Sequence, residues 1–472
     1  MTVKVYPPFK LRKITHDSAR VSLSIRALDS DDAGAAPVPQ EAPLQAHHLP
    51  EHVVLSALSE GKHEEILKAH FGDAFEDIRD AVKHIAARAQ GKKRRRVLML
   101  PGLMSSLIGI PKGDRNHVQW LDPLEVAAGS LLNLAFDRRP RIGASVGPLL
   151  PFSLPLKLRL QLADHDVDIF SYDWRYPVED IAALVAKKII EDKSAKVTLV
   201  CHSLGCLVAR AAMKNAAVNA KVEMVVVMGG PHLGAPAMSQ GIRGSYPAMK
   251  PVLDLDVKHT WVDYGRLMGT FPGVYWLLPP RGTQFGIDLR DRGVWPGDGA
   301  QPDAALLASC GSTRDALLPP DGRFFCIAGA NVDTVTAVRK QGDDFVYEYS
   351  MAGDGTVPID SAVSPGLTQA WFADGVAHDK LCAQLAPCDA AAAILDGKSP
   401  DLPTKFTARK AGVTKTETDA SLNAQRDALG RIVGDARHVA EAMHAAITKG
   451  TAAAEAAHAG LKNAGSWLRK HL

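Results

Sequence analysis

The sequence lacks the features that mark secreted, membrane-spanning and nucleic-acid-binding proteins. Its first residues contain no apolar run of the length that a secretory signal needs, and no stretch approaches the length of a membrane span. The net charge is only +3, and residues 404–472 hold eleven Lys and Arg against six Asp and Glu, so the remainder is slightly acidic. We therefore expect a cytoplasmic chain that does not bind nucleic acid, with export by a signal-independent route left open.

Cysteine is also scarce, with six residues in a chain of 472. So few thiols do not make a disulfide scaffold, and we expect them to be reduced, with a local pair of Cys382 and Cys388 as the alternative. The apolar fraction of 46% and the charged fraction of 23% are those of a globular protein. No internal repeat is visible, and the length predicts one large domain with appended segments.

Six segments differ in composition and periodicity. The residues before the core predict a strand-like piece, a linker and then helices. The basic run Lys92–Arg96 predicts a solvent-exposed segment that flanks the first core strand, with a nuclear localisation signal or a phosphate-binding patch as alternatives. The predicted boundaries are 1–50 (β-like segment and linker), 51–94 (helical), 95–235 (first part of the core), 236–320 (cap), 321–400 (second part of the core) and 401–472 (helical extension).

From Val97 onward, short apolar runs alternate with helical stretches, which predicts a mostly parallel sheet covered by helices, an α/β core. Helices fit best at 177–191 and 204–217. The apolar runs are VLML (97–100), VDIFSY (167–172), VTLVC (197–201), VEMVVVM (222–228), FFCIAG (324–329) and QAWFAD (369–374).

The alternation stops between about 234 and 320, where seven of the 28 aromatic residues fall within 261–295. An aromatic insertion after a core strand is placed to form an apolar cap, and we assign Trp261, Phe271, Tyr275 and Trp276 to its pocket lining. The alanine-rich tail from about residue 420 has helical periodicity. It predicts a helical hairpin that packs on the core or on a second copy, with membrane-surface contact near Trp467 as the alternative.

The segment VTLVCHSLGCLVAR (197–210) predicts a sharp turn from a strand into a helix at Ser203. Such a turn lifts a serine hydroxyl above the sheet edge, and the small Gly205 lets strand and helix approach closely. Cys201 stands where the usual pattern has glycine. The backbone N–H of Leu204, and that of Leu103 in the loop after the first core strand, are the candidate oxyanion donors.

A serine nucleophile needs a base and a group that orients the base. Asp354 in the turn GDGTVP and His378 after the last predicted strand follow Ser203 in the chain order of α/β-hydrolases. The rivals for the acid are Asp360, Asp374 and Asp379, and the rival for the base is His232, which precedes every candidate acid.

With these residues in place, the chain resembles the lecithin:cholesterol acyltransferase family, which includes lysosomal phospholipase A2 and phospholipid:diacylglycerol acyltransferases. The similar pieces are PGLMSSLI (101–108), QWLD (119–122), SYDWR (171–175), CHSLG (201–205), GGPHLGAP (229–236), FPGVYWLLP (271–279), GDGTVP (353–358) and the His378 loop. The resemblance implies an α/β-hydrolase fold and a triad of Ser203, Asp354 and His378 with oxyanion amides at Leu103 and Leu204.

The resemblance further implies cleavage or transfer of the acyl group of a lipid ester, without a metal or other cofactor. It gives Asp173 and Arg175 no chemical step, and we expect them to form a buried pair that supports the core, with substrate contact as the alternative. Water and an alcohol both remain open as acyl acceptors, and so do two other functions, a secreted antibacterial lipase effector and a catalytically silent binding protein. The intact Ser, Asp and His favour the enzyme.

Overall fold

The computed structural model describes residues 44–88, 94–112, 115–136, 144–256, 258–367 and 369–422. The predicted strand and linker in residues 1–43, and the tail from 423 on with its expected oligomer or membrane contacts, lie outside this range. Within it, no helix is long and apolar enough to cross a bilayer. All six cysteines are free and buried, so Cys382 and Cys388 are not paired.

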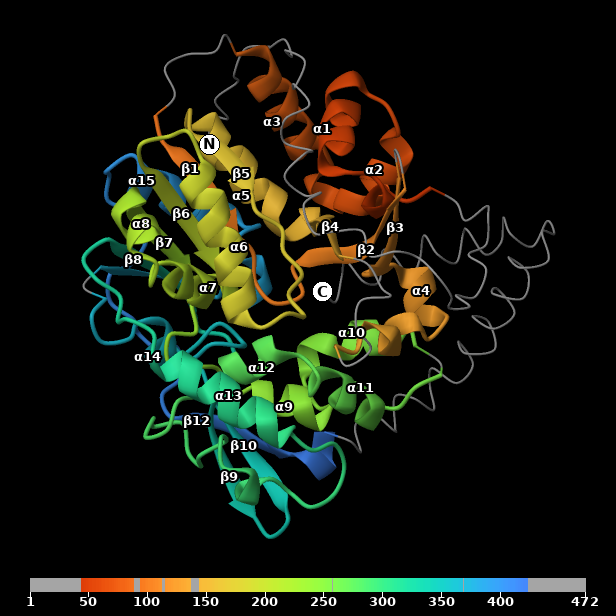
Figure 1. The fold of residues 1–472 in the computed structure, drawn as a ribbon, viewed down its shortest axis with the longest axis vertical. Helices are drawn as coiled ribbons and strands as arrows, with labels where there is room; N and C mark the ends of the chain where they lie inside the picture. Colours follow the sequence, from red (N-terminus) through yellow and green to blue (C-terminus); the bar gives the residue numbers. More distant parts are fainter. Residues whose placement is uncertain are drawn as a thin grey trace, which may run out of the picture.

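Six parallel strands form the central sheet in the order β11-β8-β7-β6-β1-β5, as Figure 1 shows. Each predicted apolar run contributes one of these strands. Their bounds are β1 Arg96–Leu100, β5 Asp166–Ile169, β6 Val197–His202, β7 Val222–Met228, β8 Phe324–Ala330 and β11 Ala370–Asp374.

Both faces of the sheet are buried, which explains why its strands are continuous apolar runs. In β1, Val97 and Met99 pack in the cluster that holds α5 and α15, whereas Leu98 and Leu100 pack on the opposite side with α6 and α7. The covering helices are α5 Leu150–Leu162 and α15 Leu385–Leu395 on the first face, and α6 Val178–Glu191, α7 Leu204–Ala212 and α8 Ala216–Lys221 on the second.

An N-terminal helical unit packs on α5, in agreement with the helical prediction for this part of the chain (Figure 1). Its apolar side chains form a separate cluster with Leu150, Leu154 and Leu158 of α5. The unit consists of η2 Ala46–His48, α1 Glu51–Glu60, α2 Glu64–Phe71, η3 Gly72–Ala74 and α3 Phe75–Ala87.

The described part of the basic run is paired with acidic side chains. Arg94 lies 2.6 Å from Asp396, and Arg95 lies 2.6 Å from Glu223. Arg96 contacts Asp168 and Asp192, the latter at 2.8 Å. These arginines therefore hold the start of β1 against neighbouring strands and loops.

Two small antiparallel sheets were not predicted. One consists of β2 Ser106–Lys112, β3 Arg115–Trp120 and β4 Ala144–Pro148, with the short helices α4 Pro123–Ala127 and η4 Ser130–Leu134 between β3 and β4. The other consists of β9 Thr334–Gln341, β10 Asp344–Ser350 and β12 Val413–Thr418.

Strand β12 corrects the prediction that residues 401–472 begin a helical extension. The β-branched alternation VTKTET pairs antiparallel with β10, so this part of the extension is a strand. Asp419, which follows it, is buried and accepts hydrogen bonds from Tyr347 Oη at 2.7 Å and Arg243 Nε at 2.6 Å. These bonds fix the strand to the cap.

The cap lies between β7 and β8, where the strand alternation stops in the sequence. In Figure 1 its helices gather beneath the central sheet. They are α9 Met238–Arg243, η5 Pro247–Met249, α10 Lys250–Leu253, α11 Trp261–Met268, α12 Pro272–Leu277, η6 Arg292–Val294 and α13 Ala304–Asp315. The short α14 Ile359–Ala362 and η7 His378–Lys380 belong to the loops after β10 and β11.

Candidate active site

Ser203 occupies the sharp turn between β6 and α7. Its backbone has φ 52° and ψ −123°, a conformation that residues with a Cβ rarely adopt, and its N–H donates to the Met228 carbonyl at 3.1 Å. A Cβ on Gly205 would lie 2.3 Å from the Leu100 carbonyl oxygen, so only glycine fits there. The local geometry is the strand-to-helix turn that the sequence predicts.

Asp354 and His378 form a buried hydrogen-bonded pair. His378 Nδ1 lies 2.8 Å from Asp354 Oδ2, and the Asp354 side chain is 1% exposed. Asp354 Oδ1 accepts two backbone hydrogen bonds, from Thr356 N–H at 3.0 Å and Val357 N–H at 2.7 Å. The two carboxylate oxygens therefore have different tasks: one is held by the turn, and the other orients the imidazole.

The pair lies beside Ser203 because three loops meet at the carboxyl edge of the sheet. A Cβ on Gly229 would lie 3.0 Å from both Asp354 Oδ2 and His378 Nδ1, and one on Gly102 would lie 2.9 Å from Ser203 Cβ. No hydrogen bond joins the Ser203 hydroxyl to His378 among the residues described. Such contacts are often longer without substrate and tighten when substrate binds.

His202 is a contact that the sequence analysis missed. Its Nε2–H donates to the His378 carbonyl at 2.9 Å, and the two rings lie 4.7 Å apart between centroids. Burial, and then the charge of His378, lower the pKa of His202 to about 3, so it stays neutral. The only signal was its place next to Ser203.

The protonation of His378 is controlled by Asp354. Burial disfavours the imidazolium, but the charge and the hydrogen bond of Asp354 outweigh it, so the pKa of His378 is raised above 6.5. The rival base His232 is fully buried near Arg210 and Arg314, and burial followed by these charges places its pKa well below 6.5. The rival acids make other contacts: Asp360 with Gln284, Asp374 with Arg409, and Asp379 with Lys380.

The two predicted oxyanion donors come shortly after β1 and β6, which are neighbouring strands, and each is the same number of residues from a paired position in the sheet. The register pairs Leu100 of β1 with Cys201 of β6, and Leu103 and Leu204 each come three residues later. Both ends of the loop that carries Leu103 are held by one motif: Tyr172 Oη donates to the Pro101 carbonyl, and Trp174 Nε1 donates to the Ser106 carbonyl at 3.0 Å. This anchoring is what the SYDWR segment contributes.

The other members of that motif pair with each other as expected. Arg175 Nη2 lies 2.6 Å from Asp173 Oδ2, and Arg175 Nε lies 2.9 Å from Asp173 Oδ1. Both side chains are largely buried.

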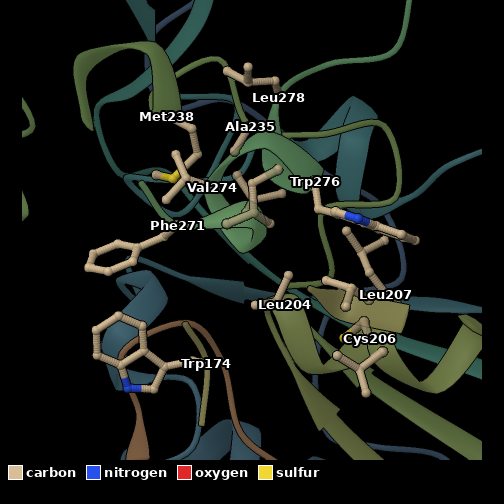
Figure 2. Packing of buried hydrophobic residues seen from close by; sticks show 14 of the residues in the cluster. Trp174, Leu204, Cys206, Leu207, Ala235, Met238, Phe271, Val274, Trp276 and Leu278 are labelled. Atoms are coloured by element: carbon tan, nitrogen blue, oxygen red, sulfur yellow. The ribbon is translucent and has the colours of Figure 1, made fainter. Parts of the chain in front are cut away.

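An apolar cavity lies under the cap and reaches the loop after Leu103. Trp261 and Phe271 line it, together with Met104, Trp174 and residues of η4, α10 and α11. Phe271 packs edge-on against Trp174 with ring centroids 5.2 Å apart (Figure 2). The lining contains no charged side chain.

Tyr275 and Trp276 are not on this cavity, which corrects the prediction for both. Tyr275 Oη donates to the Gly269 carbonyl at 2.7 Å and accepts from Asp303 N–H at 2.7 Å. Trp276 is 1% exposed and lies in the core above Leu207 (Figure 2). Phe271, the residue before α12, therefore faces the cavity, whereas Tyr275 and Trp276 within α12 pack elsewhere in the core.

Part of the chain is similar to one known protein family. The family model for lecithin:cholesterol acyltransferase (LCAT) matches residues 163–299. This part of the chain is LCAT-like. The matched region contains Ser203 and most of the cap but ends before Asp354 and His378, and no curated protein matches the sequence.

Solved structures similar to the chain include the Tle4–Tli4 complex, with a TM-score of 0.41, 14% identity, and coverage of 64% of this chain and 97% of that one. The mature lipase BlEst2 of Bacillus licheniformis has a TM-score of 0.32 and 14% identity, and the match covers 62% of this chain and 89% of that one. EstA of Clostridium botulinum has a TM-score of 0.34 and 12% identity, with coverage of 67% of this chain and 90% of that one. With its parallel sheet, strand-to-helix turn and inserted cap, the chain has the predicted α/β-hydrolase fold.

Proposed function

We propose that this LCAT-like chain is a serine hydrolase or acyltransferase that acts on lipid esters, with Ser203 as nucleophile. The observation that carries the proposal is the Asp354–His378 pair beside the strained Ser203 turn, with an apolar cavity that reaches Met104 in the loop after β1. An oriented imidazole next to a serine at such a turn is the arrangement that activates a hydroxyl.

The reaction proceeds in two steps. His378 Nε2 takes the proton of the Ser203 hydroxyl while Oγ attacks the ester carbonyl carbon, and the backbone N–H groups of Leu103 and Leu204 hold the oxyanion. The carbon–oxygen bond to the alcohol then breaks, and His378 returns the proton to the leaving oxygen. In the second step the acceptor, water or an alcohol, loses its proton to His378 and attacks the acyl carbon. The bond to Ser203 Oγ then breaks, and His378 returns the proton to that oxygen.

The cavity under the cap supports a long acyl chain as the group transferred. Its lining is apolar and begins at Met104, directly after the oxyanion donor Leu103. Burying a methylene contributes roughly 0.8 kcal/mol, so a chain that fills the cavity is favoured strongly over acetate. Product analysis with mixed phospholipids, with and without a sterol or diacylglycerol, tests the substrate class and separates water from alcohol as acceptor.

The pH dependence should report the His378 imidazole. The base acts in its neutral form, and its pKa is raised above 6.5, so activity is lost as the pH falls through that raised value and is full above it. We expect the logarithm of kcat/KM for an uncharged ester to rise with unit slope at low pH and to reach a plateau at high pH. The midpoint of this rise should lie above pH 6.5. His202, with a pKa of about 3, contributes nothing in this range. A midpoint below 6.5 would contradict the assignment of His378.

Leu253→Trp should shorten the acyl chain that the enzyme prefers. Leu253 of α10 lines the cavity, and the larger indole occupies space that the end of a long chain needs. We expect kcat/KM for p-nitrophenyl palmitate to fall about tenfold or more while the value for the acetate changes little.

The matched control for this cavity variant is Leu184→Trp on the exposed side of α6, which should leave both substrates unchanged. Thermal unfolding of both variants shows whether the fold is kept. Equal losses on palmitate and acetate would mean that the cavity does not hold the acyl chain.

A further inference from the structure

Two adjacent imidazoles of the N-terminal helical unit converge on one carboxylate of the core, far from Ser203 in the sequence. His48 Nε2 lies 2.7 Å from Asp122 Oδ2, and His47 Nε2 lies 3.2 Å from the same oxygen. The three ligand atoms all lie within 4.8 Å of one another. The ester chemistry at Ser203 does not account for this cluster, and it lies outside residues 163–299, which the family model matches, although Asp122 ends the QWLD segment.

The three side chains are almost fully enclosed, with 9%, 13% and 7% of the side-chain surface exposed for His47, His48 and Asp122. His47 Nε2 is buried and, although close to Asp122 Oδ2, makes no hydrogen bond among the described residues. A buried polar atom without a partner costs roughly 1–3 kcal/mol and calls for an explanation such as a bound ion.

The carboxylate is held in the orientation that a ligand needs. Asp122 Oδ1 accepts the Leu124 N–H at 2.7 Å and caps α4, so Oδ2 is the oxygen turned toward both rings. A cavity beside His47, bordered also by Glu51 and His70, provides space for a further ligand such as water. Orientation of ligands by such surrounding hydrogen bonds is characteristic of metal sites.

We propose that His47 Nε2, His48 Nε2 and Asp122 Oδ2 bind a divalent transition metal of the zinc type, with water completing the coordination. Two imidazoles and one carboxylate suit Zn²⁺, whereas Mg²⁺ and Ca²⁺ prefer ligand sets made of oxygen. The site would fasten the N-terminal helical unit to the loop between β3 and α4, in addition to the apolar contacts with α5.

Metal binding requires a change in the tautomer of His48. Its Nδ1 accepts the Gln45 N–H at 3.2 Å, so Nε2 carries the proton that faces Asp122. On binding, that proton moves to Nδ1, the long contact with Gln45 is given up, and the Nε2 lone pair turns to the metal.

The test is Zn²⁺ titration of the full chain without an affinity tag, by calorimetry after treatment with a chelator. We expect one Zn²⁺ per chain and a rise in melting temperature, with no effect of Mg²⁺ at the same concentration. Replacing Zn²⁺ with Co²⁺ should give the visible absorption bands of a site with nitrogen and oxygen ligands.

Variants assign the ligands. Asp122→Asn keeps an oxygen that can cap α4 but loses the charged ligand, and His47→Gln removes one imidazole; each should weaken Zn²⁺ binding by about tenfold or more. His52→Ala, on the exposed side of α1, should bind as the unmodified chain does.

The proposal is overturned if the unmodified chain shows no saturable Zn²⁺ binding, or if Asp122→Asn and His47→Gln, checked for folding by circular dichroism, bind as tightly as it does. Since these measurements do not use activity, they are independent of the ester chemistry at Ser203.

Discussion

Ser203→Ala is expected to lower the turnover of p-nitrophenyl esters by about 10⁴-fold or more, because no other group can form the acyl intermediate. The turn that carries the residue is held by backbone contacts, including the Ser203 N–H to the Met228 carbonyl, which alanine keeps. We therefore expect a folded protein with a melting temperature close to that of the unmodified chain. Rates with long-chain and short-chain esters should fall together.

A fluorophosphonate probe provides the direct measurement for this variant. The probe should label the unmodified chain and Ser194→Ala, in which the hydroxyl lost lies in the loop after α6, and it should not label Ser203→Ala. Unchanged labelling of Ser203→Ala would show that the nucleophile is another residue. Loss of labelling in both variants would indicate a folding defect, which the melting temperature detects.

Asp354→Asn is expected to lower kcat by about 10⁴-fold although it changes only one atom type, because the amide fixes the wrong tautomer of His378. The Oδ1 position receives two backbone N–H groups, from Thr356 and Val357, so the amide oxygen must lie there. The NH₂ group then faces His378 Nδ1 and donates to it. The imidazole proton moves to Nε2, which can no longer accept the proton of Ser203.

The control for this substitution is Asp360→Asn, six residues further along the chain. Asp360 hydrogen-bonds Gln284 at an exposed position and was a rival for the catalytic acid. We expect its kinetics to be close to those of the unmodified chain. If Asp360→Asn loses activity and Asp354→Asn stays within about tenfold of the unmodified chain, the acid has been assigned to the wrong residue.

The central sheet could be predicted because its strands are buried on both faces, so each one is a continuous apolar run. β2, β3 and β12 escaped prediction for the opposite reason: they are partly exposed and mixed in polarity, as in RNHVQW and VTKTET. The partner of β12 is β10, which lies far earlier in the chain, and no local pattern records that partner.

The same distinction applies to the site. Ser203 was predictable from a local strand-to-helix pattern, and Asp354 and His378 from chain order and a turn motif. His202 was not, because its hydrogen bond to the His378 carbonyl joins residues 176 positions apart. In the cap, aromatic composition indicated a pocket, but only the packing of α12 shows that Phe271 faces it and Trp276 does not.

The positive φ of Ser203 also carries evolutionary information. Non-glycine residues in such conformations cost about 1–3 kcal/mol, whereas glycine adopts them readily. Selection for thermal robustness alone would thus replace this serine with glycine and gain from the exchange. A chain that keeps a hydroxyl at a strained core turn has accepted a lasting loss of robustness, and that loss is an argument for catalysis that is independent of any sequence likeness.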